Sequence, residues 1–111
     1  MTRRAFDSKT GKVIENLSNE RQTTIDVATA KKVHFIDLNQ ASTDYVNAIG
    51  QTAADAYDLS AGDRTHLNAK GAVLFSRLVS DLLVEKYPAD FQNVTKSDAQ
   101  LSALIKAGKP Y

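Results

Sequence analysis

The sequence predicts an α/β protein in which one buried strand lies between helices. Residues 33–38 form a short apolar run that is rich in β-branched and aromatic side chains. This pattern is typical of a strand that is covered on both faces in a parallel sheet. Helical patterns stand on both sides of the run, and helix, buried strand and helix in this order favour an α/β layer.

The first helix is predicted from Ser18 or Asn19 to about Lys32. Either polar residue can cap the free amide groups of the first turn, and the lysines at the other end suit the negative pole of the helix. The first 16 residues contain Gly, Asp and Ser without apolar periodicity, so they predict an irregular arm that needs no core.

A second helix is predicted directly after the strand, capped by Asn39 or Ser42 and ended by Gly50. Its apolar residues recur at intervals of three or four, as expected for a helix with one buried face. They are Ala41, Tyr45, Val46 and Ile49.

A polar loop over 51–68 is followed by the longest predicted helix, 69–87, which Asn68 caps and Pro88 ends. Its wide apolar stripe must be buried. The stripe consists of Ala72, Val73, Phe75, Leu78, Val79, Leu82 and Leu83. The remaining tail, 88–111, predicts one short helix over 97–107, which Ser97 caps.

Composition narrows the classes of function. The chain of 111 residues has 42% hydrophobic and 24% charged residues, as expected for one folded domain. Its net charge of +1 gives no basic field, so a nucleic-acid partner is not expected. No apolar run is long enough to span a membrane, no secretory signal is present, and no cysteine supplies a disulfide or thiolate.

One strand cannot make a sheet, because its backbone groups need a neighbouring strand to pair with. The apolar stripe of the 69–87 helix also requires more partner surface than the other predicted elements offer. We therefore expect 1–111 to be a partial domain, the C-terminal half of a larger α/β unit.

The pair Asp63 and His66 lies in the polar loop, three residues apart. In a serine hydrolase an imidazole takes the proton of the attacking hydroxyl, and a carboxylate bonded to the other ring nitrogen orients it. This spacing allows the carboxylate to reach the ring without help from distant chain. By spacing alone, however, a solvated aspartate beside a helix-adjacent histidine is the more frequent explanation of the pair, because these two residue types often fall three apart by chance.

The residues around this pair, with Phe35-Ile36-Asp37-Leu38-Asn39 upstream, resemble the last conserved block of the GDSL or SGNH hydrolases. The similarity is greatest to the rhamnogalacturonan acetylesterase branch and covers 1–87, leaving 88–111 as a helical tail. The block reads Gly62-Asp63-Arg64-Thr65-His66-Leu67-Asn68-Ala69-Lys70-Gly71-Ala72.

The resemblance implies a flavodoxin-like three-layer α/β/α fold, in which Asp63 orients the ring of His66 and His66 acts as the base. It also implies a secreted carboxylic ester hydrolase without metal or organic cofactor. Its serine nucleophile and oxyanion groups would lie in an N-terminal half that this sequence does not contain. Ser8 follows an aspartate, but Phe6-Asp7-Ser8 is interpreted as a turn, and His34 as a packed or rim histidine.

Three hypotheses follow. The first is a carbohydrate esterase that removes acetyl groups from a pectin-type polysaccharide or another small ester, of which this chain carries the Asp and His half. The second is a truncated or degenerate non-catalytic remnant or interaction module, which would bury the unpaired strand edge in a dimer. The third is a small helical binding protein that only mimics the motif.

Overall fold

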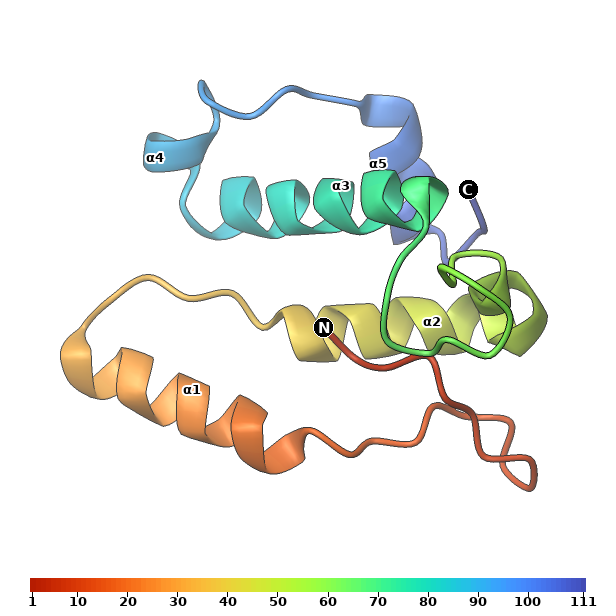
Figure 1. The fold of residues 1–111 in the computed structure, drawn as a ribbon. Coiled ribbons are helices and arrows are strands. Elements are labelled where there is room, and N and C mark those ends of the chain that lie inside the picture. Colours follow the sequence, from red (N-terminus) through yellow and green to blue (C-terminus); the bar gives the residue numbers. More distant parts are fainter.

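The computed structural model describes all 111 residues and contains five helices and no β-sheet (Figure 1). Helices account for 56% of the residues, and β pairing is limited to isolated bridges between Phe6 and Val13 and between Asp58 and Leu67. The predicted α/β, flavodoxin-like architecture is therefore wrong, and the chain folds as a small helical domain. A helical fold is what the third hypothesis expects.

The predicted strand over 33–38 is absent. Residues 33–37 have no regular secondary structure, and Leu38 is already the first residue of a helix. A strand is defined by pairing with another strand, and the chain places none beside this segment. The apolar, β-branched pattern identified a segment that is suited to a covered surface, but it could not supply the partner.

Helix α1, Ser18–Lys31, has nearly the predicted bounds and ends at Lys32 in the left-handed conformation, with φ of 54°. The predicted cap is wrong, because Leu17 occupies the N-cap position and no side chain caps the helix. Only Ala28 is buried in α1, so this helix contributes little to the core. In Figure 1 it lies along the edge of the molecule, on the far side of α2 from α3.

Helix α2, Leu38–Asp55, begins and ends differently from the prediction. Asp37, rather than Asn39 or Ser42, caps it by accepting a hydrogen bond from the Gln40 N–H at 3.1 Å. Gly50 does not end the helix but kinks it, with φ of 77° and ψ of 169°, a region that is essentially restricted to glycine. The second half of α2 thereby points the chain into the loop that carries Asp63 and His66.

Helix α3, Ala69–Lys86, is capped by Asn68 as predicted, since Asn68 Oδ1 accepts the Gly71 N–H at 2.9 Å. Pro88 ends α3 at Lys86 and also starts the short α4, Pro88–Phe91. Helix α5, Ala99–Lys106, is capped by Asp98 instead of Ser97.

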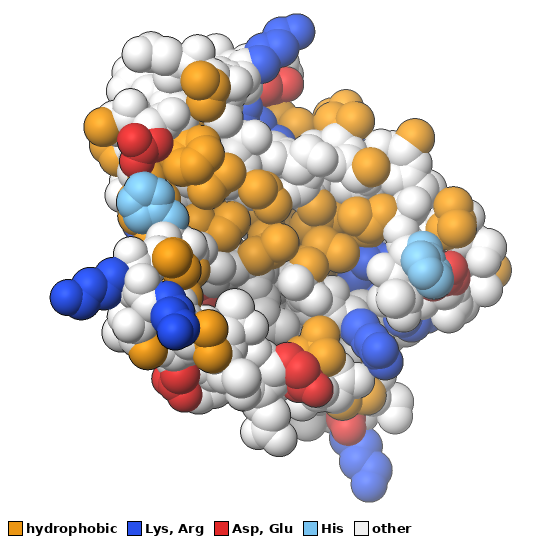
Figure 2. Space-filling view, turned by 60° about the vertical axis from the view of Figure 1, so that its left-hand side comes forward, with side chains coloured by type: hydrophobic (Ala, Val, Ile, Leu, Met, Phe, Trp, Pro, Cys, Tyr) orange, Lys and Arg blue, Asp and Glu red, His pale blue; other side chains and the backbone are white.

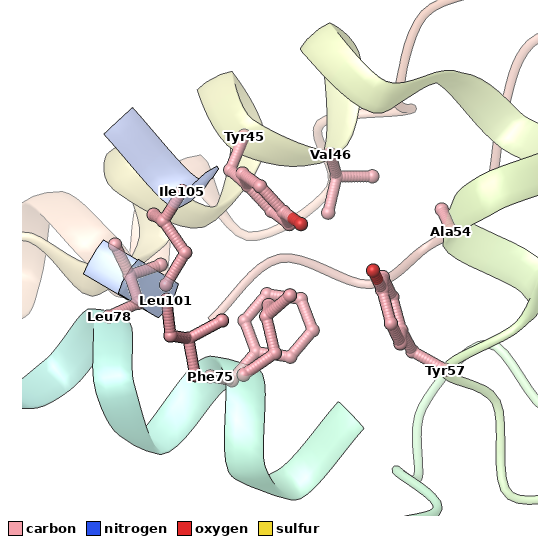
Figure 3. Packing of buried hydrophobic residues seen from close by; sticks show 9 residues of the cluster. Tyr45, Val46, Ala54, Tyr57, Phe75, Leu78, Leu101 and Ile105 are labelled. Carbon is pink, nitrogen blue, oxygen red and sulfur yellow. The ribbon is translucent and has the colours of Figure 1, made fainter. Parts of the chain in front are cut away.

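The core lies between α2, α3 and α5 (Figure 3). Its centre is Phe75, whose ring meets the rings of Tyr45 and Tyr57 edge-on, each with centroids 6.2 Å apart. The predicted stripe on α3 is right only in part, because Leu74 is fully buried while Val73 is 50% exposed. The buried cluster comprises Tyr45, Val46, Ala54, Tyr57, Leu74, Phe75, Leu78, Leu101 and Ile105.

A large part of the apolar surface stays uncovered. Only 16 of the 111 residues are buried. The accessible surface is 7035 Å², whereas a folded monomer of this mass exposes about 6,000 Å². Figure 2 shows hydrophobic side chains gathered in a hollow between two lobes of the molecule. No helix has the length and apolar character that crossing a membrane requires.

We call this surface the apolar hollow. It consists of adjoining depressions that share Ile36 and Leu38 and extend over α1, the 33–37 segment and α3. Its apolar lining residues are mostly half-buried. They are Met1, Leu17, Ile25, Phe35, Ile36, Leu38, Leu67, Ala72, Phe75, Val79 and Leu82.

Candidate acid-base site

The loop between α2 and α3 folds into a tight turn at Asp63. Asp63 Oδ1 accepts hydrogen bonds from the backbone N–H groups of Thr65 at 3.0 Å and His66 at 2.9 Å. Such a turn, made by an aspartate with amides two and three residues on, folds the chain back over the carboxylate. Gly62, with φ of 80°, provides the backbone bend that precedes it.

The same turn brings the two predicted site residues together. His66 Nδ1 lies 3.0 Å from Asp63 Oδ2 and 3.2 Å from Oδ1, so the carboxylate faces one nitrogen of the ring. The other ring nitrogen, Nε2, has no hydrogen-bond partner in the chain, and the His66 side chain is 70% exposed. The predicted contact is thus present, whereas the catalytic roles of both residues stay predictions.

Backbone hydrogen bonds hold Asp63 in its charged form. The His66 N–H, followed by the Thr65 N–H, lowers the pKa of the Asp63 carboxyl to about 2. The carboxylate is therefore ionised at neutral pH. A charged carboxylate beside Nδ1 can both orient an imidazole and stabilise the imidazolium that forms when Nε2 accepts a proton.

Arg4 supports this loop from beneath, which sequence reasoning missed. Its side chain is completely buried and donates from Nε to Asp58 Oδ1 at 2.6 Å. Nη2 donates to the carbonyl oxygen of His66 at 2.6 Å and lies 3.4 Å from that of Asp63. The prediction that the N-terminal arm needs no core is wrong, because the arm passes under the loop and supplies this arginine.

A second arginine ties the loop to the end of α2. Arg64 Nη1 donates to Asp58 Oδ2 at 2.9 Å and also pairs with Asp55. The Asp58 side chain is only 3% exposed, and a buried carboxylate needs partners for its charge. Arg4 and Arg64 both pair with it. No local pattern could have indicated this cluster, because Arg4 and Asp58 are 54 positions apart in the sequence.

No nucleophile meets the dyad within this chain, since no hydroxyl is hydrogen-bonded to His66. Ser8 lies in a turn in which Asp7 Oδ1 accepts the N–H groups of Lys9 and Thr10, as its interpretation as turn chemistry predicts. His34 stacks on Tyr87 with ring centroids 3.9 Å apart and is 59% exposed, as expected for a rim histidine. The chain contains no cluster of metal-ligating side chains.

The relationship to the SGNH hydrolases stays a prediction that depends on the residues around Asp63 and His66. The geometry of these residues agrees with the contact that the motif implies, while the helical fold does not agree with the predicted architecture. Comparison of the chain with models of protein families, with curated proteins and with solved structures finds no match.

Proposed function

We propose that Asp63 and His66 are the acid and base of a carbohydrate esterase whose serine nucleophile is supplied by another stretch of polypeptide. The observation that carries the proposal is the ring of His66, which meets an ionised carboxylate at Nδ1 and leaves Nε2 free in solvent. This is the arrangement that a general base requires before its nucleophile arrives.

The chemistry follows from the two ends of the imidazole. The Asp63 carboxylate accepts a hydrogen bond from the Nδ1–H group and so holds the proton on that nitrogen. The lone pair of Nε2 can then take the proton of a serine hydroxyl as that oxygen attacks the acetyl carbonyl. The ring becomes a cation, which the adjacent carboxylate stabilises. It then returns the proton to the departing sugar oxygen, and water releases acetate in a second cycle of the same steps.

The substrate class comes from the resemblance to the rhamnogalacturonan acetylesterases. It implies an acetylated pectin-type polysaccharide, a secreted enzyme and no cofactor. Ester hydrolysis by this route needs water, the three side chains and the oxyanion groups of the other half, so the proposal requires no metal ion.

The experiment is to co-express or fuse the chain with a family-type N-terminal half and to measure acetate release from an activated acetyl ester and from acetylated pectin. His66→Ala and Asp63→Asn should each lower kcat/KM by roughly 10³-fold or more, because the nucleophile loses its oriented base. His34→Ala is the matched control, since His34 is also an exposed histidine beside an aspartate, Asp90. Equal activity in the native fusion and in all three variants would refute the assignment of Asp63 and His66 as catalytic residues.

The uncovered apolar surface favours a second candidate, a non-catalytic interaction module. This candidate expects no acetate release in any assembly that contains the chain. It also expects both dyad variants to bind their partner as the native chain does. A His66→Ala loss of hydrolysis in the fused protein would exclude it.

A further inference from the structure

The 33–37 segment presents two edges with different surroundings. The Phe35 N–H donates to the Tyr87 hydroxyl at 3.0 Å, and the Phe35 carbonyl accepts from the same hydroxyl at 2.9 Å. Both groups of one residue meet a single atom only if they point to the same side, as in an extended chain. Lys86 Nζ also donates to the Phe35 carbonyl, at 2.8 Å. The end of α3 therefore occupies this edge.

The opposite edge is open. In an extended chain the peptide groups of successive residues point to alternate edges, so those of His34 and Ile36 face away from Tyr87. Neither residue's N–H nor its carbonyl makes a hydrogen bond within the chain. A row of free donors and acceptors of this kind is a template for another strand.

We propose that this edge pairs with the same edge of a second copy of the chain, antiparallel and about a two-fold axis at Phe35. In this register His34 lies opposite Ile36 of the second copy, and Ile36 lies opposite its His34. Each of these pairs exchanges both of its backbone hydrogen bonds. Phe35 faces Phe35 of the second copy at the non-hydrogen-bonded position, where side chains approach most closely.

Charge and area both fit a second copy. The register sets Val33 opposite Asp37 of the second copy, so no like charges meet, and each chain has a net charge of only +1. Ile36 borders two depressions of the apolar hollow, so pairing would cover that surface. The chain exposes roughly 1,000 Å² more than its mass predicts, and a standard interface buries about 800 Å² per partner. The dimer does not depend on the proposed esterase.

Sedimentation equilibrium of the native chain tests the pairing. The expected mass is twice the 12.1 kDa of one chain. Ile36→Pro removes a free N–H without breaking a hydrogen bond of the monomer, and its dissociation constant should rise about tenfold or more. A second pair of variants, Ile36→Lys and Val73→Lys, introduces the same charge at two apolar positions. Lysine is used for this pair because a proline at Val73 would break α3. Val73 is exposed but lies outside the hollow, and only Ile36→Lys should dissociate the dimer.

A single-cysteine crosslink tests the register. The chain has no cysteine, so Phe35→Cys can form a disulfide only with a second copy. Residues at the non-hydrogen-bonded position have Cα atoms about 4.5 Å apart, within the range that a disulfide spans. Val94→Cys, at an exposed apolar residue outside the 33–37 segment, should stay reduced under the same mild oxidation.

Each outcome decides for or against the pairing. A dimer that Ile36→Pro and Ile36→Lys dissociate, and that Phe35→Cys links, establishes it. A monomer at all concentrations overturns it and leaves the edge to a different polypeptide. A dimer that both Ile36 variants retain overturns it as well, because another surface must then join the copies. The helical signal in circular dichroism checks that each variant is folded. If an Ile36 variant does not fold, the Phe35→Cys crosslink is the test of the pairing.

Discussion

Arg4 lies buried beneath the loop of the candidate site, where its guanidinium contacts three residues of that loop. One side meets the Asp58 carboxylate, and the other meets the carbonyl groups of Asp63 and His66, the two residues of the dyad. The planar fork of an arginine suits this geometry, whereas a lysine ammonium would reach fewer of these acceptors. Arg4 is therefore a positioning residue, because it touches the backbone of the dyad and not its reacting atoms.

Replacing Arg4 should loosen the turn and change the titration of Asp63. Arg4→Met leaves the buried Asp58 carboxylate with one partner fewer. The free energy of unfolding, measured by urea unfolding, should therefore fall by about 3 kcal/mol. The pKa of Asp63 should rise from about 2 toward its ordinary value, because the amides of Thr65 and His66 no longer stay aimed at it. Carboxyl carbon shifts measured against pH report this directly.

The sign of the pH dependence follows from the lowered pKa. In the native chain the stabilisation due to ionised Asp63 is complete above its unfolded pKa and is lost as the pH falls through about 2. In Arg4→Met this stabilisation should be smaller, and its loss should be complete at a higher pH, because the folded pKa lies closer to the unfolded one. Arg21→Met is the control, since Arg21 pairs with Asp37 at a half-exposed site away from the loop. An unchanged Asp63 pKa in Arg4→Met would contradict the positioning role.

Helix α3 owes its position beside the loop to a glycine in its first turn. A Cβ atom at Gly71 would lie 2.8 Å from the Tyr57 carbonyl oxygen and 2.9 Å from Tyr57 Cβ. The close approach also lets the Asn68 N–H donate to that carbonyl at 3.0 Å. Gly71 thus allows the start of α3 to pack directly against the chain that leads into the site.

Gly71→Ala should destabilise the chain although alanine is the better helix former. Helix propensity alone favours alanine by about 1 kcal/mol, but contact with a fixed backbone carbonyl costs roughly 1–3 kcal/mol. Thermal and urea unfolding should therefore show a net loss. Ser76→Ala, at an exposed position of the same helix, should change stability by only about 0.5 kcal/mol. A Gly71→Ala chain more stable than the native one would show that the loop can move away.

At the scale of the whole molecule, the C-terminus holds the small core together. Tyr45 Oη donates to the Lys109 carbonyl at 3.0 Å, and Tyr57 Oη donates to the backbone oxygen of Tyr111 at 3.2 Å. The Tyr111 N–H donates back to Tyr57 Oη at 2.9 Å. The last residues therefore satisfy the hydroxyl groups of two buried tyrosines that flank Phe75.

Deletion of residues 109–111 should lower the free energy of unfolding by about 1–3 kcal/mol, because both tyrosine hydroxyls lose their backbone partners. Tyr111→Ala keeps those backbone groups and removes a side chain that is 42% exposed, so its effect should be much smaller. Urea unfolding of both variants gives the comparison. Equal stability of the deletion and the native chain would mean that water replaces the lost partners.

Prediction from the sequence succeeded where the interacting residues are close along the chain. The turn at Asp63 and the Asn68 cap each join residues three apart, so residue type and spacing sufficed. The 33–37 segment shows the opposite case. Its composition favours a strand, but a strand exists only through a neighbour, and the end of α3 lies there instead.

The sequence by itself determined the helices α1 and α3 to within a few residues and the contact between Asp63 and His66, because local backbone hydrogen bonds specify them. Only the tertiary structure decided that the fold is helical and that Arg4 lies under the loop, 62 positions from the His66 carbonyl that it contacts. Buried polar groups must find hydrogen-bond partners, and which groups lie within reach depends on how the whole chain packs. Contacts of this kind produce no periodic pattern in the sequence, so they could not be predicted from it.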